Sequence, residues 1–225
     1  MNDNFDSRAL GKTDCYGQRF MKVGTYRYHV LPVGGDRYTD ERPYMIKVVE
    51  RRATTKMNSH NVAVTQVGHF HAEPGEITIE AGDMVLWNCC TSGAQPYIVV
   101  GDKEFFNSAR LVNESGYTHA FGTPGEFEWV DVHGGKASGI VRVKNPACKD
   151  AKDVQRWRNQ LSKGTIVMIS DGKVEPQQVE IMVGQTVFFA VVNGVGISIT
   201  DRRIAGMGAG DACKAPAKRS ERSAK

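Results

Sequence analysis

Two histidines separated by one residue, His69 and His71, have the spacing in this sequence that best fits a metal site. Residues i and i+2 of a β-strand point to the same face, so both imidazoles could reach one ion. His119 or His133 could add a third ligand if the fold brought it close. Because supporting ligands at fixed spacing are missing, we favour a simpler interpretation, two partly exposed histidines on an edge strand.

The five cysteines are an odd number and contain no CxxC pair. Such a set is a poor disulfide framework and is typical of a reducing compartment. The adjacent Cys89 and Cys90 would point to opposite faces of a strand, which favours buried apolar thiols over joint metal capture. Because no nucleophile elbow, phosphate-binding loop or HExxH motif is present either, we expect no enzymatic activity.

Basic residues gather at the C-terminal end, although the net charge of the chain is only +4. Residues 206–225 have no apolar period and predict a disordered basic tail, either simply solvated or in weak contact with an anionic membrane surface or an acidic partner. Without interleaved aromatic residues, the tail does not indicate nucleic-acid binding. The candidate contact residues in it are Lys214, Lys218, Arg219 and Arg222.

The first residues are polar and predict a flexible N-terminus over 1–16 rather than a secretory signal. The chain also has no apolar run of about 18 residues, the length that a membrane helix needs. We therefore expect a cytoplasmic protein, with a peripheral position at a membrane left open.

The elements that would position these residues are mostly short strands. Alternating or continuous apolar runs, such as residues 76–80, 84–87 and 139–143, are separated by Pro-Gly, Gly-Asp and Gly-Gly turn signals. Short strands at this spacing predict a sandwich or a barrel.

An internal repeat refines this prediction. The pattern over residues 73–87 recurs over 175–189, an offset of 102 (175 minus 73), and the pattern over 20–28 recurs over 121–129, an offset of 101 (121 minus 20). We interpret residues 62–145 as one complete central sandwich. The segments 17–50 and 163–205 then look like two halves that come together as a second sandwich. Pairing of these halves between neighbouring molecules remains the alternative.

Residues 149–163 predict a helix that connects the sandwiches, since they combine good helix formers with early acids and no internal Gly or Pro. Val154, Trp157 and Leu161 fall on one helical face. Trp157 could be a binding hot spot, but a packing anchor is the interpretation we favour.

The opening pattern Glu73–Asn88 and the closing pattern Phe121–Val143, which includes His133-Gly-Gly, resemble the first and last strands of a cupredoxin. The resemblance is clearest over residues 62–145 and weaker in the terminal halves. It implies an all-β chain of two cupredoxin-like Greek-key β-sandwiches joined by a short α-helix, the second assembled from the N- and C-terminal segments.

Cupredoxins hold copper with two histidines, one cysteine and a weak axial methionine. The resemblance places these ligands near Tyr97, at Val130, at His133 and within residues 136–138. Only His133 is a ligand type, so it marks a vestigial position, and Val130 cannot form the Cu–thiolate bond. We therefore expect no copper and no other cofactor.

A folded chain without copper or catalysis would act through its surfaces. The sequence therefore predicts a structural or docking subunit of a larger assembly with protein partners. The electron-transfer role of cupredoxins suggests a membrane-associated photosynthetic or respiratory complex as the setting. The main alternative is a metal-binding protein, an atypical electron carrier or a copper chaperone, that uses His69, His71 and His133. An enzyme subunit whose active site a partner completes is a third, less favoured option.

Overall fold

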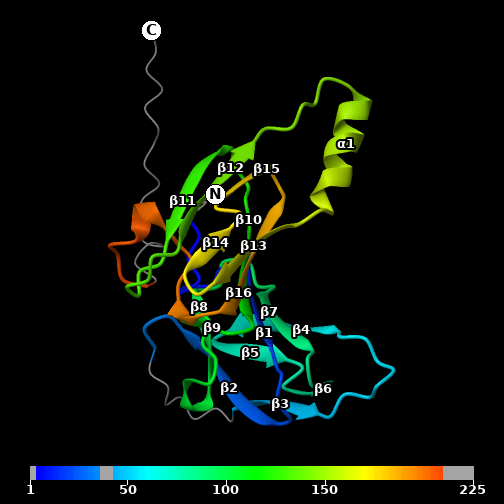
Figure 1. The fold of residues 1–225 in the computed structure, drawn as a ribbon, viewed down its shortest axis with the longest axis vertical. Helices are drawn as coiled ribbons and strands as arrows, with labels where there is room; N and C mark the ends of the chain where they lie inside the picture. Colours follow the sequence, from blue (N-terminus) through cyan, green and yellow to red (C-terminus); the bar gives the residue numbers. More distant parts are fainter. Residues whose placement is uncertain (1–3, 36–42, 210–225) are drawn as a thin grey trace.

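A computed structural model describes residues 4–35 and 43–209 of the chain. This part of the protein is predominantly β, as the sequence predicts, and its strands form two stacked β-sandwiches with one α-helix at one end (Figure 1). No helix among the described residues is long and apolar enough to cross a bilayer.

The first sandwich uses consecutive strands from the N-terminal half of the chain. One of its layers has the order β6-β3-β2-β8, and the other has the order β1-β7-β4-β5. The ring of Trp87 in one layer meets that of Tyr28 in the other edge-to-face at 5.4 Å, and both side chains are fully buried. Its strands are β1 (Asp14–Arg19), β2 (Gly24–Pro32), β3 (Tyr44–Val49), β4 (Ser59–Val67), β5 (His69–Glu73), β6 (Glu76–Glu80), β7 (Met84–Cys89) and β8 (Tyr97–Gly101).

The second sandwich repeats this plan with the rest of the chain. Its layers have the orders β15-β12-β11-β18 and β14-β13-β16-β10, and Trp129 packs on Phe189 between them at 5.4 Å. A two-stranded ladder and two short 3-10 helices complete the connections. These elements are η1 (Asp102–Glu104), β9 (Leu111–Val112), β10 (Ser115–Ala120), β11 (Gly125–Val130), β12 (Ser138–Lys144), β13 (Thr165–Ser170), β14 (Lys173–Glu175), β15 (Gln178–Met182), β16 (Thr186–Asn193), β17 (Val195–Ile197), β18 (Thr200–Asp201) and η2 (Arg202–Ile204).

The predicted grouping of segments into sandwiches is wrong. Strand β3 pairs in parallel with β6, and β12 pairs in parallel with β15, so the sandwiches follow one another along the chain. Within the described residues, no strand of the segment 17–50 pairs with a strand of 163–205, and the segment 62–145 is divided between both sandwiches. The repeat has the length of one sandwich, so it fixes the period without fixing where each unit begins. In both units the pattern of residues 20–28 or 121–129 precedes the pattern of residues 73–87 or 175–189 in the sequence.

The two sandwiches share one continuous sheet. Strand β1 of the first pairs with β10 of the second, which joins two four-stranded layers into an eight-stranded sheet of order β14-β13-β16-β10-β1-β7-β4-β5. Figure 1 shows this sheet running through the middle of the molecule from the upper to the lower sandwich. Because the joint is a backbone ladder with buried side chains beneath it, the two sandwiches form one packed unit.

The N-terminal segment ties the sandwiches together as well, so residues 4–13 are not the flexible stretch that the sequence predicts. Phe5 and Leu10 are fully buried. The carbonyl oxygen of Phe5 accepts a hydrogen bond from the backbone N–H of Asp201 in the second sandwich. Leu10 exchanges two backbone hydrogen bonds with Tyr97 in the first. The segment therefore bridges equivalent strands of both units, β18 and β8.

The predicted helix is present as α1 (Ala151–Leu161), but it connects β12 to β13 within the second sandwich rather than one sandwich to the other. Asp150 caps its first turn by accepting a hydrogen bond from the backbone N–H of Asp153. Figure 1 shows the helix at the upper end of the molecule.

The turn between β6 and β7 is organised by a buried carboxylate, Asp83. Burial by itself would raise the pKa of Asp83. Four hydrogen bonds to the carboxylate outweigh the effect of burial and hold the pKa well below the usual range. They come from the backbone N–H groups of Asn58 and Glu80 and from the side chains of His60 and Arg51. One repeat later, the neutral Gln185 accepts the corresponding hydrogen bond from the backbone N–H of Met182. The same turn is thus built with a charge in the first sandwich and without one in the second.

Candidate functional site: the outward face of the eight-stranded sheet

The eight-stranded sheet turns one face away from both cores, and that face has an unusual composition. One outward row carries the basic residues Arg19 and Lys173. Beside it, two further rows of outward side chains cross the face, each following the strand register. Apart from one glutamate at the end of each row, at opposite edges of the sheet, neither row contains an acidic or basic residue. The first row is Ile166, Phe188, Thr118, Cys15, Asn88, Ala63 and Glu73, and the second is Glu175, Met168, Ala190, Gly116, Gly17, Leu86 and Asn61.

The centre of this face is formed by two glycines that are register partners, Gly17 of β1 and Gly116 of β10. A Cβ atom at Gly116 would lie 2.2 Å from Cε2 of Phe188, and one at Gly17 would lie 3.0 Å from Cδ2 of Leu86. The two large side chains therefore lie over the glycines and level the surface where the sandwiches meet.

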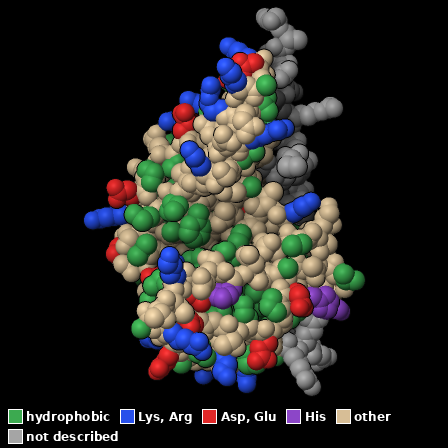
Figure 2. Space-filling view, turned by 90° about the vertical axis from the view of Figure 1, so that its right-hand side faces the viewer, with side chains coloured by type: hydrophobic (Ala, Val, Ile, Leu, Met, Phe, Trp, Pro, Cys, Tyr) green, Lys and Arg blue, Asp and Glu red, His purple; other side chains and the backbone are tan. Residues whose placement is uncertain are grey.

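In the second sandwich, hydrophobic exposure on this face is highest on β13. Ile166 is 56% exposed and Met168 is 51% exposed, while Phe188 and Leu86 are partly buried. Figure 2 shows hydrophobic side chains gathered at mid-height, below the Lys and Arg side chains of the upper end. Exposed apolar side chains that gather on one face of a folded protein commonly mark an interaction site.

The sequence does carry a signal for this surface. The runs 165–169 and 186–191 are apolar or uncharged at successive positions rather than at alternate ones. In a layer with one face on the core, such a run means that the other face is apolar too. The glycines carry no such signal, because their role depends on which strand lies beside them.

Beneath the joint, on the inner side of the same ladder, lies a buried polar cluster. Asp14 accepts hydrogen bonds from the hydroxyl of Tyr117 (2.6 Å) and from Nδ1 of His119 (2.7 Å), and its other oxygen accepts one from the backbone N–H of Gly11 (2.7 Å). Nε2 of His119 has no hydrogen-bond partner in the described part of the chain. The ring of Phe5 lies 5.4 Å away, and Phe121 packs edge-on at 4.7 Å. The cluster therefore holds β1 to β10 from inside and is closed off from solvent.

The positions that the cupredoxin resemblance assigns to copper ligands do not come together around one point. Tyr97 is buried in the first sandwich, where it pairs with Pro32 and Leu10, whereas Val130 pairs with Thr200 in the second. The counterpart of Tyr97 in the second sandwich is Ile199, at the repeat offset of 102 (199 minus 97). That side chain is fully buried and cannot bind a metal.

The loop that contains His133 is held by a carboxylate instead. Asp131 accepts hydrogen bonds from the backbone N–H groups of His133 (2.9 Å), Gly135 (2.8 Å) and Ser198 (2.9 Å). His133 itself is exposed, and its Nε2 donates to the carbonyl oxygen of Ala109 at 2.8 Å. Its ring is therefore engaged in fixing the loop against the preceding segment.

The other candidate metal residues lie on strands of a different sheet from that loop. His69 and His71 are exposed on the edge strand β5, in agreement with the interpretation we favoured. His119 is buried in the joint, so it does not join them. Among the residues that the structure describes, no group of three His, Cys, Asp or Glu side chains is placed to hold a metal ion.

The cysteine pair behaves as strand geometry predicts, with Cys89 buried and Cys90 exposed. Burial raises the pKa of the Cys15 thiol to about 12, and the neighbouring Asp14 carboxylate adds to the shift. A thiol in that state is a poor nucleophile and a poor metal ligand at neutral pH.

The remaining interaction candidates have different outcomes. Nε1 of Trp157 donates to the carbonyl oxygen of Val183 at 2.9 Å, which agrees with a packing anchor for α1. Residues 210–225 are outside the described part of the chain, and the candidates Lys214, Lys218, Arg219 and Arg222 lie there.

Comparison with known proteins finds no match for this chain. No family model matches the chain, and neither a curated protein nor a solved structure matches it. What the protein does must therefore be argued from its own surfaces and buried contacts.

Proposed function

We propose that this protein is a non-catalytic docking subunit that packs the outward face of its eight-stranded sheet against a partner protein in a larger assembly. The proposal rests on the two register rows described above. Their only charged side chains are Glu175 and Glu73, which lie at opposite edges of the sheet. The preferred partner is a protein surface that is apolar and uncharged, because such a surface can cover Met168 and Phe188 without burying an unpaired charge.

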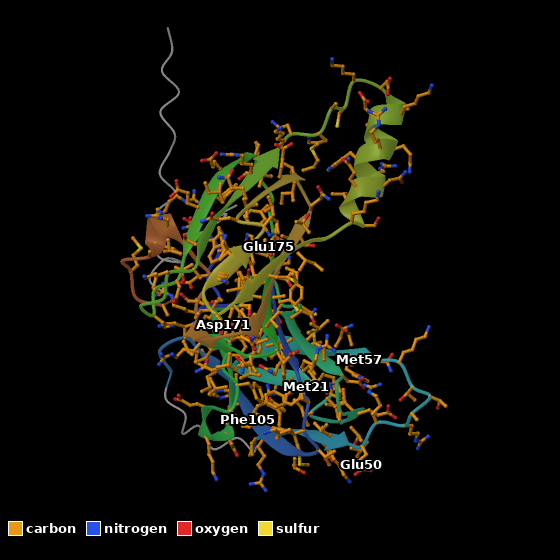
Figure 3. All side chains as sticks on the ribbon, in the orientation of Figure 1. Met21, Glu50, Met57, Phe105, Asp171 and Glu175 are labelled. Carbon is orange, nitrogen blue, oxygen red and sulfur yellow. The ribbon has the colours of Figure 1, made fainter. Side chains whose placement is uncertain are left out.

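An anionic membrane is the poorer match for this face. Peripheral membrane binding by a folded domain relies on basic side chains next to apolar ones. The two rows carry no Lys or Arg, and their two terminal charges, Glu73 and Glu175, are acidic. Of the two basic residues in the neighbouring outward row, Lys173 and Arg19, the second is paired with Glu114 at 3.4 Å. Figure 3 shows Glu175 at mid-height in the upper sandwich.

The cupredoxin resemblance suggests the setting, a membrane-associated photosynthetic or respiratory electron-transfer complex. In that setting the sandwiches would be kept for their shape, with Asp131 fixing a loop that holds a metal in copper-binding relatives. Metal binding through His69 and His71 remains the competing function, and it would use an exposed edge strand with two imidazoles.

The test is purification from the native host under mild conditions, with the wild type compared to the double variant Ile166→Glu/Met168→Glu. Both side chains are about half exposed, so the variant should fold as the wild type does. Thr78→Glu, on the exposed face of the other layer of the first sandwich, is the matched control. We expect a partner at fixed stoichiometry with the wild type and the control, and its loss with the double variant. A partner retained at the same stoichiometry by all three proteins, or a wild type that purifies alone, would reject the proposal.

A further inference from the structure

A second apolar feature, separate from the sheet face, lies where the connections between the sandwiches converge. It is a cleft of about 440 Å³, contributed by the β1–β2 turn, the residue after η1, strand β9 and the β16–β17 turn. That volume is in the range of protein sites that enclose a small ligand or an anchoring side chain. Residues that line it include Phe20, Met21, Lys22, Tyr26, Phe105 and Val112.

The cleft has an aromatic wall. The ring of Tyr26 lies 4.9 Å from that of buried Phe20 and 5.0 Å from that of Phe105. Phe105 is 59% exposed and Met21 is 55% exposed, so the wall continues onto the surface. Figure 3 shows these two side chains near each other in the lower sandwich. The surface is thus suited to an aliphatic side chain from another protein.

The same chain presents such a side chain next to the cleft. Val195 is 98% exposed, and it pairs in register with Val112, which lines the cleft. The turn before it is fixed, because the backbone N–H of Gly194 donates to Oδ1 of Asn113 at 2.7 Å. The exposed Val195 and the cleft residue Val112 are therefore neighbours in the short β9–β17 ladder.

Charges on the two sides are complementary. Three charged residues line the cleft. Arg19 and Glu114 form an ion pair with each other at 3.4 Å, whereas Lys22 forms none within the described residues. Asp171 lies beside the turn that precedes the valine, since its backbone N–H donates to the carbonyl oxygen of Asn193 at 3.0 Å. Asp171 is exposed and likewise forms no ion pair in the part of the chain described.

We infer that the occupant of this cleft is Val195 of a second copy of the chain, in a two-fold symmetric dimer. A two-fold interface needs one surface that is complementary to itself. This surface meets that condition, because the projecting Val195 lies next to a cleft that can receive the same residue of another copy. Each copy would insert its valine into the cleft of the other. Each Asp171 would face the Lys22 of the opposite copy.

Sedimentation equilibrium of the purified full chain over a range of concentrations tests this inference. The wild type should associate to a dimer, and Val195→Asp should raise the dissociation constant about tenfold or more. Val67→Asp is the matched control, because Val67 is 80% exposed at the distant β4–β5 turn. The control should dimerise as the wild type does. A wild type that stays monomeric, or an equal effect of both substitutions, would overturn the inference.

A charge exchange gives a second readout that does not depend on Val195. Lys22→Asp and Asp171→Lys should each weaken the dimer, and the double variant Lys22→Asp/Asp171→Lys should recover most of the loss. Additive weakening in the double variant would contradict the proposed pairing. Dimerisation that depends on Met168 instead of Val195 would also overturn it, since the sheet face would then be the contact between copies.

Discussion

Gly17 and Gly116 stand opposite each other across the β1–β10 ladder, one from each sandwich, and both face outward. Their missing side chains leave room for Leu86 and Phe188 to lie across the joint. The place where two repeated units meet is therefore also the centre of the two register rows whose only charged side chains are Glu73 and Glu175. This coincidence links the duplication of the fold to the proposed docking surface.

Substituting Gly116 tests that packing. Gly116→Ala would place a Cβ atom 2.2 Å from the ring of Phe188, so the ring must move. We expect a loss of about 1–3 kcal/mol in the free energy of unfolding, measured by urea denaturation. Gly164→Ala is the control, because its nearest neighbour would be 3.7 Å away. Equal stability of the two variants would show that the ring of Phe188 can move without loss of packing, and it would contradict this prediction.

The buried cluster at the joint should be far more sensitive than a surface ion pair. Asp14→Ala leaves the hydroxyl of Tyr117 and Nδ1 of His119 buried without their acceptor. We expect destabilisation of about 2–4 kcal/mol, seen as a lower midpoint in chemical denaturation. Lys144→Ala removes an exposed partner of Glu180 and should change stability by less than about 1 kcal/mol. Similar losses in both variants would contradict the role given to the cluster.

Acid should weaken the first sandwich through Asp83. Its pKa is depressed in the folded state, so between the folded and the unfolded pKa the unfolded chain binds more protons. The stabilisation is fully present above the unfolded value of about 3.9 and is lost as pH falls through the folded pKa. Denaturation curves recorded from neutral to acidic pH should show this loss in the wild type. The Asp83→Asn variant should be less stable at neutral pH, and its stability should change less with pH in the acidic range. Parallel dependence of stability on pH in the two proteins would refute this assignment.

Metal analysis distinguishes the docking proposal from its competitor. We expect the native protein to contain no stoichiometric copper and no strong visible band from a copper–thiolate bond, since Val130 stands where the cupredoxin resemblance would place the cysteine. Added divalent copper or nickel should bind weakly through His69 and His71, and His69→Ala/His71→Ala should abolish that binding in titration calorimetry. Stoichiometric copper that survives purification would favour an electron carrier or chaperone.

Much of the fold could be predicted, because the apolar alternation and the turn residues are local. The matching patterns at 73–87 and 175–189 gave the number of sandwiches and the equivalence of Trp87 and Phe189. They could not give the grouping, since a tandem repeat looks the same from any starting point. Whether β6 pairs with β3 or with β12 depends on contacts between distant segments.

The candidate site was harder to predict for the same reason. The partnership of Asp14 with His119 and that of Gly17 with Gly116 exist only once β1 lies beside β10. His133 was identified by its place in a motif, but the Asp131 carboxylate that fixes its loop was not. Sequence patterns locate single residues well, whereas a surface spread over eight strands requires the order of those strands.

The central claim, docking through the sheet face, is tested most directly by site-specific photo-crosslinking in the native host. A photoreactive amino acid replaces Met168 in one protein and Thr78 in another, at exposed positions on different layers. We predict one crosslinked partner of defined mass from position 168 and none from position 78. Crosslinks from position 78 alone, or equal labelling from both positions, would contradict the account.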